Sequence, residues 1–493
     1  MILNYAEFKD KVNACWIGKN IGGTMGTPYE GKKEMQDIKG FVTKPGEVLP
    51  NDDLDLQLVW LMAMEQLGAY SVNAATLGEY WVSFITPHWN EYGIGKCNLK
   101  RGLQAPLAGD YLNHWKNSNG AWIRTEIWAS VAPGVPAAAA KYAIEDAKVD
   151  HGAGEGTYAA AFVAAMQSAA FIISDIRKCI EIGLAAIPES SRMAQSIKFV
   201  LKCYEKGMDY RAARNAVQQI NSDIGDGWFE APSNVSYAVI GLLWGEGDFK
   251  KTMIYAINCG DDTDCTGATV GATLGILNGM AGIPTDWKEY LGDDIITISI
   301  ARGNNARRLP ATCAELTERV VKLAPSVLFA NRYLGEVTIS EVKATEIPEN
   351  AIDILFGGAK HVNSEFSRLK PYMTHFDSVL FDVDVTLPIG PDIEPNGTVP
   401  VTVDIYNNCS PVTHENAPYN LSLRWILPDG FTLEGGKRAV YLDERSSHAR
   451  DPQANVSVTV TAGEKVEAVN RIVLEIVAEG RPTAVYVPIV LLG

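Results

Sequence analysis

Two periodicities divide this chain into two parts. From about residue 5 to residue 330, apolar side chains recur at three-to-four-residue spacing, which is typical of amphipathic and buried α-helices. After about residue 335, apolar and polar positions alternate, as they do along half-buried β-strands. We therefore predict an all-α domain over residues 1–335 and an all-β sandwich over residues 345–493, with the boundary between 330 and 350.

The pattern also places individual elements. The glycine-rich segment 18–31 interrupts the first helical stretch, and residues 87–109 lack a helical period and are expected to form a loop. The segments predicted as helices are residues 5–18, 54–67, 74–84, 137–147, 157–173, 191–206, 210–220, 234–244, 266–279 and 309–323. The segments predicted as strands are residues 379–385, 399–406, 421–427, 456–460, 472–477 and 483–491.

Two acidic clusters each precede a long apolar helical segment. They are residues 51–55 (NDDLD), which follow Pro50, and residues 260–264 (GDDTD), which begin with a glycine. Such positions lie in the first turn of a helix, where carboxylates cap free N–H groups and face the positive end of the helix dipole. One interpretation is that the acidic residues of both clusters only cap their helices and are exposed to solvent. Because the clusters hold more carboxylates than capping requires, and oxygen-rich clusters suit hard cations, we predict that they meet and bind a divalent metal.

Composition narrows the possible classes of protein. The chain has 493 residues, a hydrophobic fraction of 47% and a net charge of −16, and this acidic balance argues against nucleic-acid binding. The eight cysteines lack the C-x-x-C spacing of a cysteine-type zinc site. No apolar run is long enough to span a bilayer, and residues 1–11 lack the apolar core of a signal peptide. We expect a cytoplasmic protein.

Several motifs, in the same order, resemble those of the ADP-ribosylglycohydrolase family. The resemblance covers about residues 10–330 and leaves out the predicted sandwich. The family signature N-x-G-G-D-T-D-T, followed by a small-residue helix and I-P, is similar to residues 258–265 (NCGDDTDC) and 282–284 (GIP). The other matching segments are residues 51–54 for T-D-D-T, 18–30 for the glycine-rich segment that ends in an acid, 119–124 (NGAWIR) for N-G-A-x-x-R, and His151 for the histidine of the middle segment.

The resemblance implies an all-helical domain with a two-metal site, usually magnesium, between the acidic motifs; calcium and manganese would also fit. Asn51 and Cys265 each stand where the family has a threonine, and Asp261 replaces a glycine. A cysteine is a poor ligand for a hard cation, so one metal is expected to be weakened, lost or held differently. The implied metal ligands are Asn51, Asp52, Asp53, Asp262, Asp264 and Cys265.

Candidate catalytic and substrate-binding residues lie around these motifs. The predicted catalytic residues are Glu30, which matches the acid–base residue of some members, Glu155 in a glycine-rich loop, and Asp53. Arg124 could clamp a phosphate, and Trp89, Trp122 and Trp228 could stack on an adenine or a sugar. For each residue alone, core packing or helix capping remains an alternative. The predicted substrate-binding residues are Tyr29, Trp122, Arg124, His151, Trp228 and Glu230.

The leading hypothesis is a metal-dependent glycosylhydrolase. It would cleave an N- or O-glycosidic bond at the anomeric carbon of an ADP-ribosyl or related ribosyl or furanosyl substrate. One alternative is a glycoside hydrolase acting on a carbohydrate without a diphosphate, because a diphosphate needs a basic clamp and Arg124 is the sole candidate near the motifs. A second alternative is a catalytically decayed binding or sensor protein, with Cys265 as the sign of decay. The expected partner is a small molecule, not nucleic acid or a membrane, and the sandwich could support homo-oligomerisation.

Overall fold

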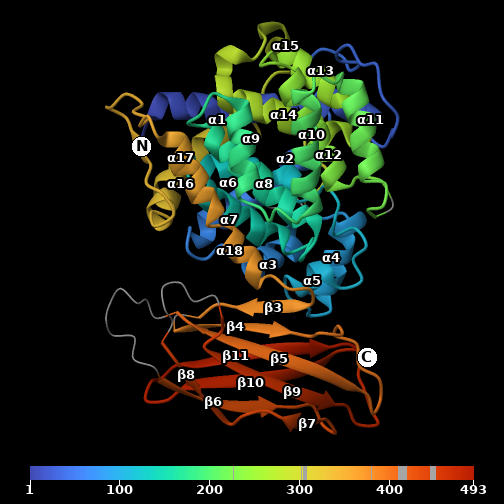
Figure 1. The fold of residues 1–493 in the computed structure, drawn as a ribbon, viewed down its shortest axis with the longest axis vertical. Helices are drawn as coiled ribbons and strands as arrows, with labels where there is room; N and C mark the ends of the chain where they lie inside the picture. The colour runs from blue at the N-terminus through green and yellow to red at the C-terminus, as the bar shows by residue number, and fades with distance from the viewer. Residues whose placement is uncertain (226, 301–302, 304–307, 379, 409–418, 445–450) are drawn as a thin grey trace. The chain divides into compact units, whose positions relative to one another are not determined.

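The chain forms two compact units. The computed structural model describes residues 1–225, 227–300, 303, 308–378, 380–408, 419–444 and 451–493. Its helical unit comprises residues 1–94 and 113–367, and its β unit comprises residues 95–112 and 368–493 (Figure 1). The predicted fold class, a helical domain followed by antiparallel β-sheets, is confirmed.

In its described residues, the helical unit is built from helices and one short parallel pair of strands, β1 (Ile2–Asn4) and β2 (Thr338–Ser340). Among the described helices, none has the length and apolarity needed to cross a bilayer. Its elements are α1 (Tyr5–Gly26), η1 (Thr27–Tyr29), α2 (Asp52–Leu67), α3 (Ala74–Phe84), the start of α4 (Asn90–Lys100), η2 (Trp122–Arg124), α6 (Glu126–Val131), α7 (Pro136–Ala147), α8 (Glu155–Ala170), α9 (Ile176–Ala185), α10 (Arg192–Glu205), α11 (Tyr210–Ile220), α12 (Ala231–Trp244), α13 (Phe249–Asn258), α14 (Thr263–Asn278), η3 (Met280–Gly282), α15 (Thr285–Leu291), α16 (Cys313–Ala330), α17 (Ala351–Lys360) and α18 (Asn363–Arg368).

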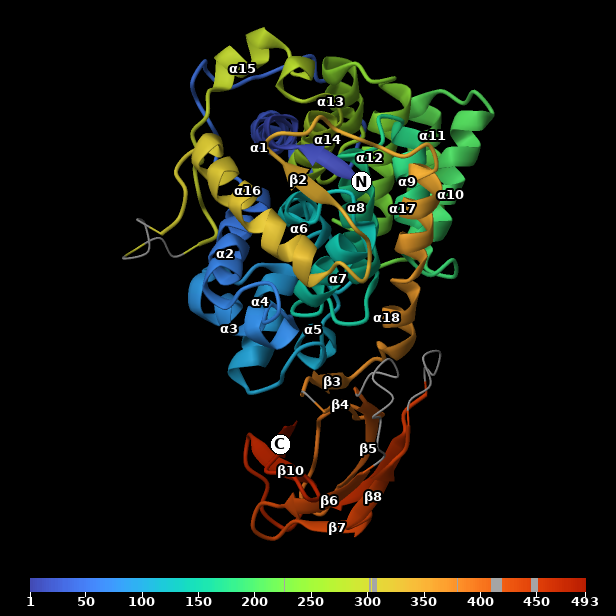
Figure 2. The same ribbon diagram turned by 90° about the vertical axis from the view of Figure 1, so that its left-hand side faces the viewer.

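Helices α1 and α14 lie side by side within the helical unit (Figure 2). Their contact is made by glycines: a Cβ atom on Gly22 would overlap the carbonyl oxygen of Gly267, and one on Gly18 would overlap that of Gly271. Glycine therefore allows the two backbones to touch. At the end of this contact the Thr263 hydroxyl donates to the carbonyl oxygen of Gly26 at 2.9 Å, which brings the end of α1 to the start of α14.

The structure differs from the predicted elements in several places. Residues 87–109, expected to form a loop, contain α4, whose sequence NEYGIGKCNLK has too few apolar residues to show a helical period. Helix α17 falls after the point where the period was expected to change to that of strands. The short helices α9, α13, α15 and α18 were also not predicted, because a segment of about ten residues or fewer gives only a weak periodic signal.

The β unit is a sandwich of two antiparallel sheets. The strand orders are β3-β4-β5-β9-β7 and β11-β10-β6-β8, and inward side chains of both sheets, such as Val403 and Leu474, share one core. The predicted strand at 379–385 starts on a residue outside the described ones, and β3, β7 and β8 are too short to have been predicted. The elements are α5 (Leu107–Asp110), β3 (Met373–Phe376), β4 (Phe381–Thr386), β5 (Thr398–Asn407), β6 (Tyr419–Ile426), β7 (Thr432–Gly435), β8 (Ala439–Leu442), β9 (Ala454–Thr461), β10 (Asn470–Ala478) and β11 (Ala484–Leu491).

A histidine flanked by two carboxylates joins β3 to β4. His375 lies directly opposite Asp384 in the antiparallel pair. Its Nδ1 lies 2.6 Å from Asp384 Oδ1 and its Nε2 lies 2.7 Å from Asp377 Oδ1. Burial alone would lower the pKa of His375, but these two partners overcome that effect and raise the pKa to about 10. The imidazolium is therefore the stable form of this side chain in the folded protein at neutral pH.

Candidate active site

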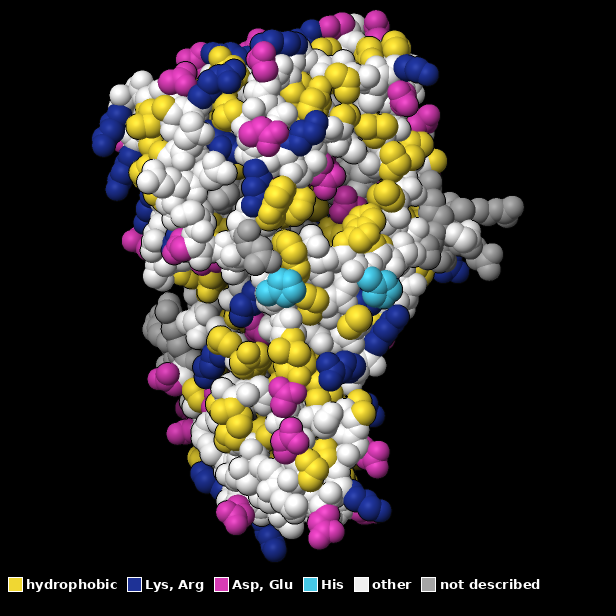
Figure 3. All heavy atoms as spheres, turned by 90° about the vertical axis from the view of Figure 1, so that its right-hand side faces the viewer, with side chains coloured by type: hydrophobic (Ala, Val, Ile, Leu, Met, Phe, Trp, Pro, Cys, Tyr) yellow, Lys and Arg dark blue, Asp and Glu magenta, His cyan; other side chains and the backbone are white. Residues whose placement is uncertain are grey.

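A cavity of about 590 Å³ opens on the helical unit, and acidic side chains lie in a hollow bordered by hydrophobic ones (Figure 3). Its walls come from segments far apart in the sequence, and five of its lining residues are carboxylic acids. The lining residues are Thr27, Glu30, Pro50, Asp52, His88, Trp89, Asn90, Glu91, Tyr92, Ser118, Asn119, Gly120, Ile123, Phe229, Asp262, Asp264, Cys265 and Ile298.

The first acidic cluster forms the first turn of α2. The Asn51 side chain caps this helix, because its Oδ1 accepts from the N–H group of Asp53 at 2.8 Å. Asp52 lines the cavity and accepts from the Tyr92 hydroxyl at 3.1 Å. Burial, and next the charge of Asp264, raise the pKa of Asp52 to about 6.

Two other acids of this turn are buried behind the cavity wall. Asp53 is fully buried, with its Oδ2 3.8 Å from the Lys19 ammonium group, and it accepts from the thiol of Cys265 at 3.3 Å. Asp55 accepts from the backbone N–H groups of Ile298 and Ser299 at 2.5 and 2.6 Å. The carboxylate of Asp55 therefore anchors a backbone segment, one residue of which lines the cavity.

The second acidic cluster begins with a tight turn before α14. Gly260 and Asp261 both have positive φ angles, of 78° and 65°. The Asp261 N–H donates to the carbonyl oxygen of Lys32 at 2.7 Å, and the Asp261 carbonyl accepts from the N–H of Gly31 at 2.8 Å. These two bonds fix the segment that follows Glu30 against the turn. The Asp261 side chain accepts from Asn234 at 2.9 Å and does not line the cavity.

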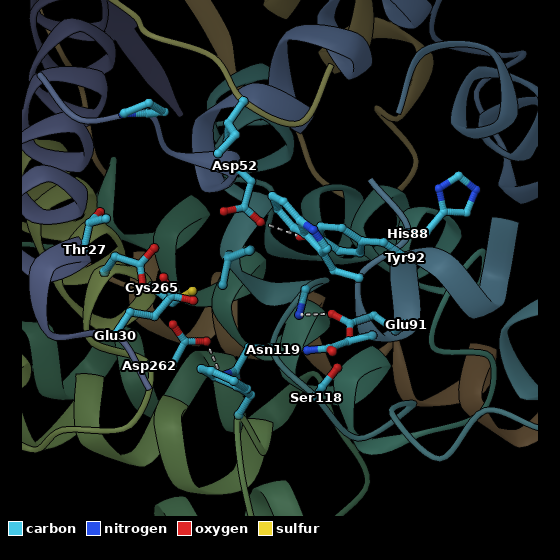
Figure 4. Close-up of a pocket in the computed structure, with 18 residues that line it drawn as sticks. Thr27, Glu30, Asp52, His88, Glu91, Tyr92, Ser118, Asn119, Asp262 and Cys265 are labelled. Atoms are coloured by element: carbon cyan, nitrogen blue, oxygen red, sulfur yellow. Dashed lines mark hydrogen bonds between the residues drawn. The ribbon is translucent and has the colours of Figure 1, made fainter. Parts of the chain in front are cut away.

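Four acids from these elements meet at one side of the cavity, where Glu30, Asp262 and Cys265 lie close together near Asp52 (Figure 4). Glu30, Asp262 and Asp264 can offer ligand atoms within 4.8 Å of one another. Asp262 Oδ1 and Asp264 Oδ1 are buried and have no hydrogen-bond partner among the described residues. A buried carboxylate oxygen without a partner is costly, so this donor set fits a divalent cation.

Mutual repulsion perturbs these acids. The charge of Asp264, then desolvation, then the charge of Asp52 raise the pKa of Glu30 to about 8. Burial, followed by the charges of Asp264 and Glu30, raises the pKa of Asp262 well above its usual value. A bound cation would remove this repulsion.

The opposite wall contains residues that the sequence did not single out as chemical groups. Asn119 Nδ2 donates to Asp262 Oδ2 at 2.5 Å, and Glu91 Oε1 accepts from the N–H of Gly120 at 3.1 Å (Figure 4). Glu91 Oε2 is buried without a hydrogen-bond partner among the described residues, and burial is the main cause that raises the Glu91 pKa. Glu91 could have been recognised as an acidic residue in the first turn of a helix, but α4 itself was not predicted.

Three predicted substrate-binding residues support this wall from behind. Arg124 is fully buried, and its guanidinium group donates to Asp146 and Asp150 and to the carbonyl oxygen of Gly120. His151 Nδ1 lies 2.9 Å from Asp150 Oδ1, and the Trp122 indole donates to Asn119 Oδ1 at 2.8 Å. Neither Arg124, His151 nor Trp122 lines the cavity, and the donors of Arg124 are already engaged.

Four other predicted residues lie outside the cavity lining: Tyr29, Glu155, Trp228 and Glu230. Both carboxylate oxygens of Glu155 accept backbone N–H groups at the start of α10, at 3.0 and 2.9 Å. Glu230 is buried beside the start of α12. Tyr29 and Trp228 are each covered by a lysine, with ammonium-to-ring distances of 4.9 and 3.8 Å. Trp89, at 46% exposure, and Phe229 are the large aromatic side chains that line the cavity beside Tyr92.

Comparison with known proteins assigns the chain to a family. The family profile of ADP-ribosylglycohydrolases matches residues 4–322, which is more than half of the chain. The chain belongs to the ADP-ribosylglycohydrolase family. Membership supports glycohydrolase activity in general, and divalent metals are commonly bound in this family.

Solved structures and curated proteins add little beyond the family. A structure described as an ADP-ribosylglycohydrolase-related protein complex is 20% identical, with a TM-score of 0.40, over 65% of this chain and 99% of that one. A FixG-related protein from Vibrio parahaemolyticus is 10% identical, with a TM-score of 0.18, over 23% of this chain and 97% of that one. No curated protein matches the chain.

The departures from the ADP-ribosylglycohydrolase motif take different positions in the structure. The Asn51 amide oxygen is occupied as a helix cap, and its Nδ2 lies against Gly23. Asp261 stabilises the turn, as described above. Cys265 alone among the three departures lines the cavity, where its thiol faces Asp53.

Proposed function

We propose that this protein is a metal-dependent hydrolase that cleaves an N- or O-glycosidic bond at the anomeric carbon of a ribosyl or related furanosyl substrate, ADP-ribosyl compounds included. One observation carries the proposal: Glu30, Asp52, Asp262 and Asp264 reach one cavity wall from separate segments. A sugar that enters this cavity meets several fixed carboxylates and the cation they would hold. The family assignment supports the same reaction class.

The residues that would hold the cation are Asp52, Asp262 and Asp264, with Glu30 beside them. Magnesium is the first candidate, and manganese and calcium also suit oxygen ligands. When bound, such a cation supplies a template for sugar hydroxyls and a Lewis acid. Asn119 fixes the orientation of Asp262 by its 2.5 Å hydrogen bond, and the Tyr92 hydroxyl holds Asp52 in place.

Proton transfer falls to carboxyl groups on the two walls. Hydrolysis at an anomeric carbon passes through a transition state with oxocarbenium character and needs an acid for the leaving group. Glu91 suits this role because burial favours its protonated form and one of its oxygens has no partner among the described residues. Glu30, beside the metal ligands, suits the activation of water.

A glycoside without a diphosphate is the second candidate substrate. The described lining residues include five carboxylic acids and neither lysine nor arginine, and the donors of Arg124 are engaged by Asp146 and Asp150. Such a wall repels a diphosphate unless bound cations compensate for the charge. Trp89 offers an exposed aromatic face on which a sugar ring could stack.

The proposed activity is tested with an ADP-ribosyl-arginine and a simple aryl furanoside, with hydrolysis followed by NMR of the anomeric proton. The chelator-treated protein should be inactive and should regain turnover with Mg²⁺ or Mn²⁺. Asp262→Ala should abolish both metal binding, measured by calorimetry, and turnover. Asp286→Ala, which changes an exposed aspartate paired with Lys250, should leave both unchanged.

Two results would contradict the proposal. If Asp262→Ala still binds metal fully, the metal site does not lie in this cavity. If turnover is the same before and after chelation, the reaction does not require a metal. A cytoplasmic location and homo-oligomers formed through the β-sandwich stay predictions from the sequence.

A further inference from the structure

We propose that Asp53, Asp264 and Cys265 form a mixed oxygen–sulfur site that binds a thiophilic divalent cation such as Zn²⁺ in preference to Mg²⁺. The inference rests on the proposed function in that it assigns metal to the same acidic centre. It goes further, because it assigns different cations to the two clusters of that centre, which are Glu30 with Asp262 and Asp264, and Asp53 with Asp264 and Cys265.

The three side chains converge from two helices. Asp53 comes from the first turn of α2, and Asp264 and Cys265 come from the first turn of α14. Each can offer a ligand atom within 4.8 Å of the others. All three are buried, and because Asp264 and Cys265 line the cavity, a cation can reach the cluster from it. Oxygen and sulfur atoms are thus collected in one small volume.

A second observation points to a missing cation. Asp264 is only 4% exposed, yet its Oδ1 atom has no hydrogen-bond partner among the described residues. The cysteine thiol can donate one hydrogen bond, and it donates it to Asp53 at 3.3 Å. The thiol therefore leaves the Asp264 oxygen without a partner, and a cation at this position would satisfy it.

The sulfur ligand determines which cation this site prefers. Carboxylates, carbonyls and water suit Mg²⁺ and Ca²⁺, whereas a thiolate selects softer ions and binds Zn²⁺ well. As the cation binds, the S–H bond of Cys265 breaks, its proton passes to solvent and an S–metal bond forms, without any change of oxidation state. A threonine at this position, as in the family motif, would instead offer a hydroxyl oxygen.

Asp264 links this site to its neighbour. The other cluster of the centre, Glu30 with Asp262 and Asp264, contains oxygen ligands only and suits a hard cation. Because Asp264 belongs to both clusters, the two sites would share this residue. The centre then pairs one site for a hard cation with one for a thiophilic cation.

Cobalt is the probe for the thiolate. Chelator-treated wild-type protein is titrated with Co²⁺, and the absorption spectrum is recorded. We expect a sulfur-to-cobalt charge-transfer band in the near ultraviolet, which equimolar Zn²⁺ removes and a large excess of Mg²⁺ does not. Cys265→Thr should lack the band, and Cys265→Ser serves as the second variant if the threonine protein does not fold.

Affinities measured by competition complete the test. Loss of even an outer-sphere partner lowers metal affinity by about 10–100-fold, so replacement of the thiol by a hydroxyl should lower Zn²⁺ affinity by at least this factor. Affinity for Mg²⁺ should stay the same or rise. The matched control is Cys259→Ala, because the Cys259 thiol donates back to the carbonyl oxygen of Tyr255 and does not line the cavity. This variant should keep both the band and the Zn²⁺ affinity.

The outcomes separate this inference from the proposed function. Cobalt binding without a charge-transfer band, or the same band in Cys265→Thr, overturns the mixed site while leaving an oxygen-bound metal for hydrolysis. A thiolate band in a protein that hydrolyses neither glycoside supports the mixed site and contradicts the proposed function. Absence of any metal binding contradicts both.

Discussion

Lys19 provides the sharpest test of the electrostatics of this fold. Its side chain is fully buried on α1, and its ammonium group lies 3.0 Å from Glu126 Oε2 and 3.8 Å from Asp53 Oδ2. It also donates to the carbonyl oxygen of Ile123 at 2.7 Å. The change Lys19→Met keeps most of the apolar stem and removes the charge, so two buried carboxylates lose their cation.

The magnitude follows from the distances. At 3.0 Å and an effective dielectric constant of about 20, the Lys19–Glu126 attraction is about 5.5 kcal/mol. Removing one partner of a buried pair typically costs about 3–5 kcal/mol, because the other charge stays buried. We expect Lys19→Met to lower the free energy of unfolding of the helical unit by about 3–5 kcal/mol. The assay is denaturant unfolding followed by the circular dichroism of the helices.

Two further variants make this prediction refutable. Lys9→Met removes a surface lysine from the same helix, where it pairs with Glu318, and should leave the free energy of unfolding nearly unchanged because solvent screens such a pair. Adding Glu126→Gln to Lys19→Met removes one of the two carboxylate charges left without a cation and should recover part of the loss. If Lys19→Met costs no more than Lys9→Met, or if the Lys19 and Glu126 changes are simply additive, the buried pair is not what stabilises this region.

Three other changes test the packing and the titration of the two units. Gly22→Ala presses a methyl group against the carbonyl oxygen of Gly267 and should lower the free energy of unfolding by about 1–3 kcal/mol, measured with denaturant. The charge of Asp264 is the main cause that raises the pKa of Glu30 from 4.5 to about 8. Between these two pH values, Glu30 is protonated in the folded, chelator-treated protein and ionised in the unfolded chain. Stability should therefore fall as pH rises from 4.5 to 8, and Glu30→Gln should flatten that slope in denaturant titrations. His375, whose pKa is raised from 6.5 to about 10, contributes stability that is complete below pH 6.5 and lost as pH rises through 10, and His375→Asn should remove this dependence from the hydrogen exchange of β4.

Controls are available for these changes. Gly357→Ala places a methyl group in open space on α17 and should stabilise the protein by about 0.5–1 kcal/mol, since alanine is the better helix former. Glu34→Gln alters an exposed acid near Glu30 and should leave the pH slope unchanged. If hydrogen exchange of β4 has the same pH dependence with and without His375, the charged pairing between β3 and β4 does not stabilise the sheet.

Local signals made part of the site predictable. Asn51 caps α2, and Gly260 forms a tight turn just before α14, because capping and turn formation depend on residues adjacent in sequence. The convergence of the two acidic turns was predicted from their surplus of carboxylates, and the resemblance to a family supported that prediction. Periodicity alone would have indicated only two capped helices.

Contacts between distant segments give Glu155 and Arg124 surroundings that the sequence pattern did not indicate. Glu155 looked accessible among glycines, yet its carboxylate is taken by the start of α10, a partner that no local pattern indicates. Arg124 looked like an anion clamp, yet Asp146 and Asp150 neutralise it inside the fold. Glu91 was missed because α4 carries no helical period.

The glycine-mediated pairing of α1 with α14 has a consequence for biosynthesis. The first of these helices leaves the ribosome long before the second, and closing so long a loop is slow and entropically costly. Until α14 emerges, α1, a helix buried along most of its length, has no backbone groove to occupy and exposes apolar surface. We expect nascent chains truncated before α14 to aggregate or to recruit chaperones, and the acidic centre to exist only after α14 has been synthesised.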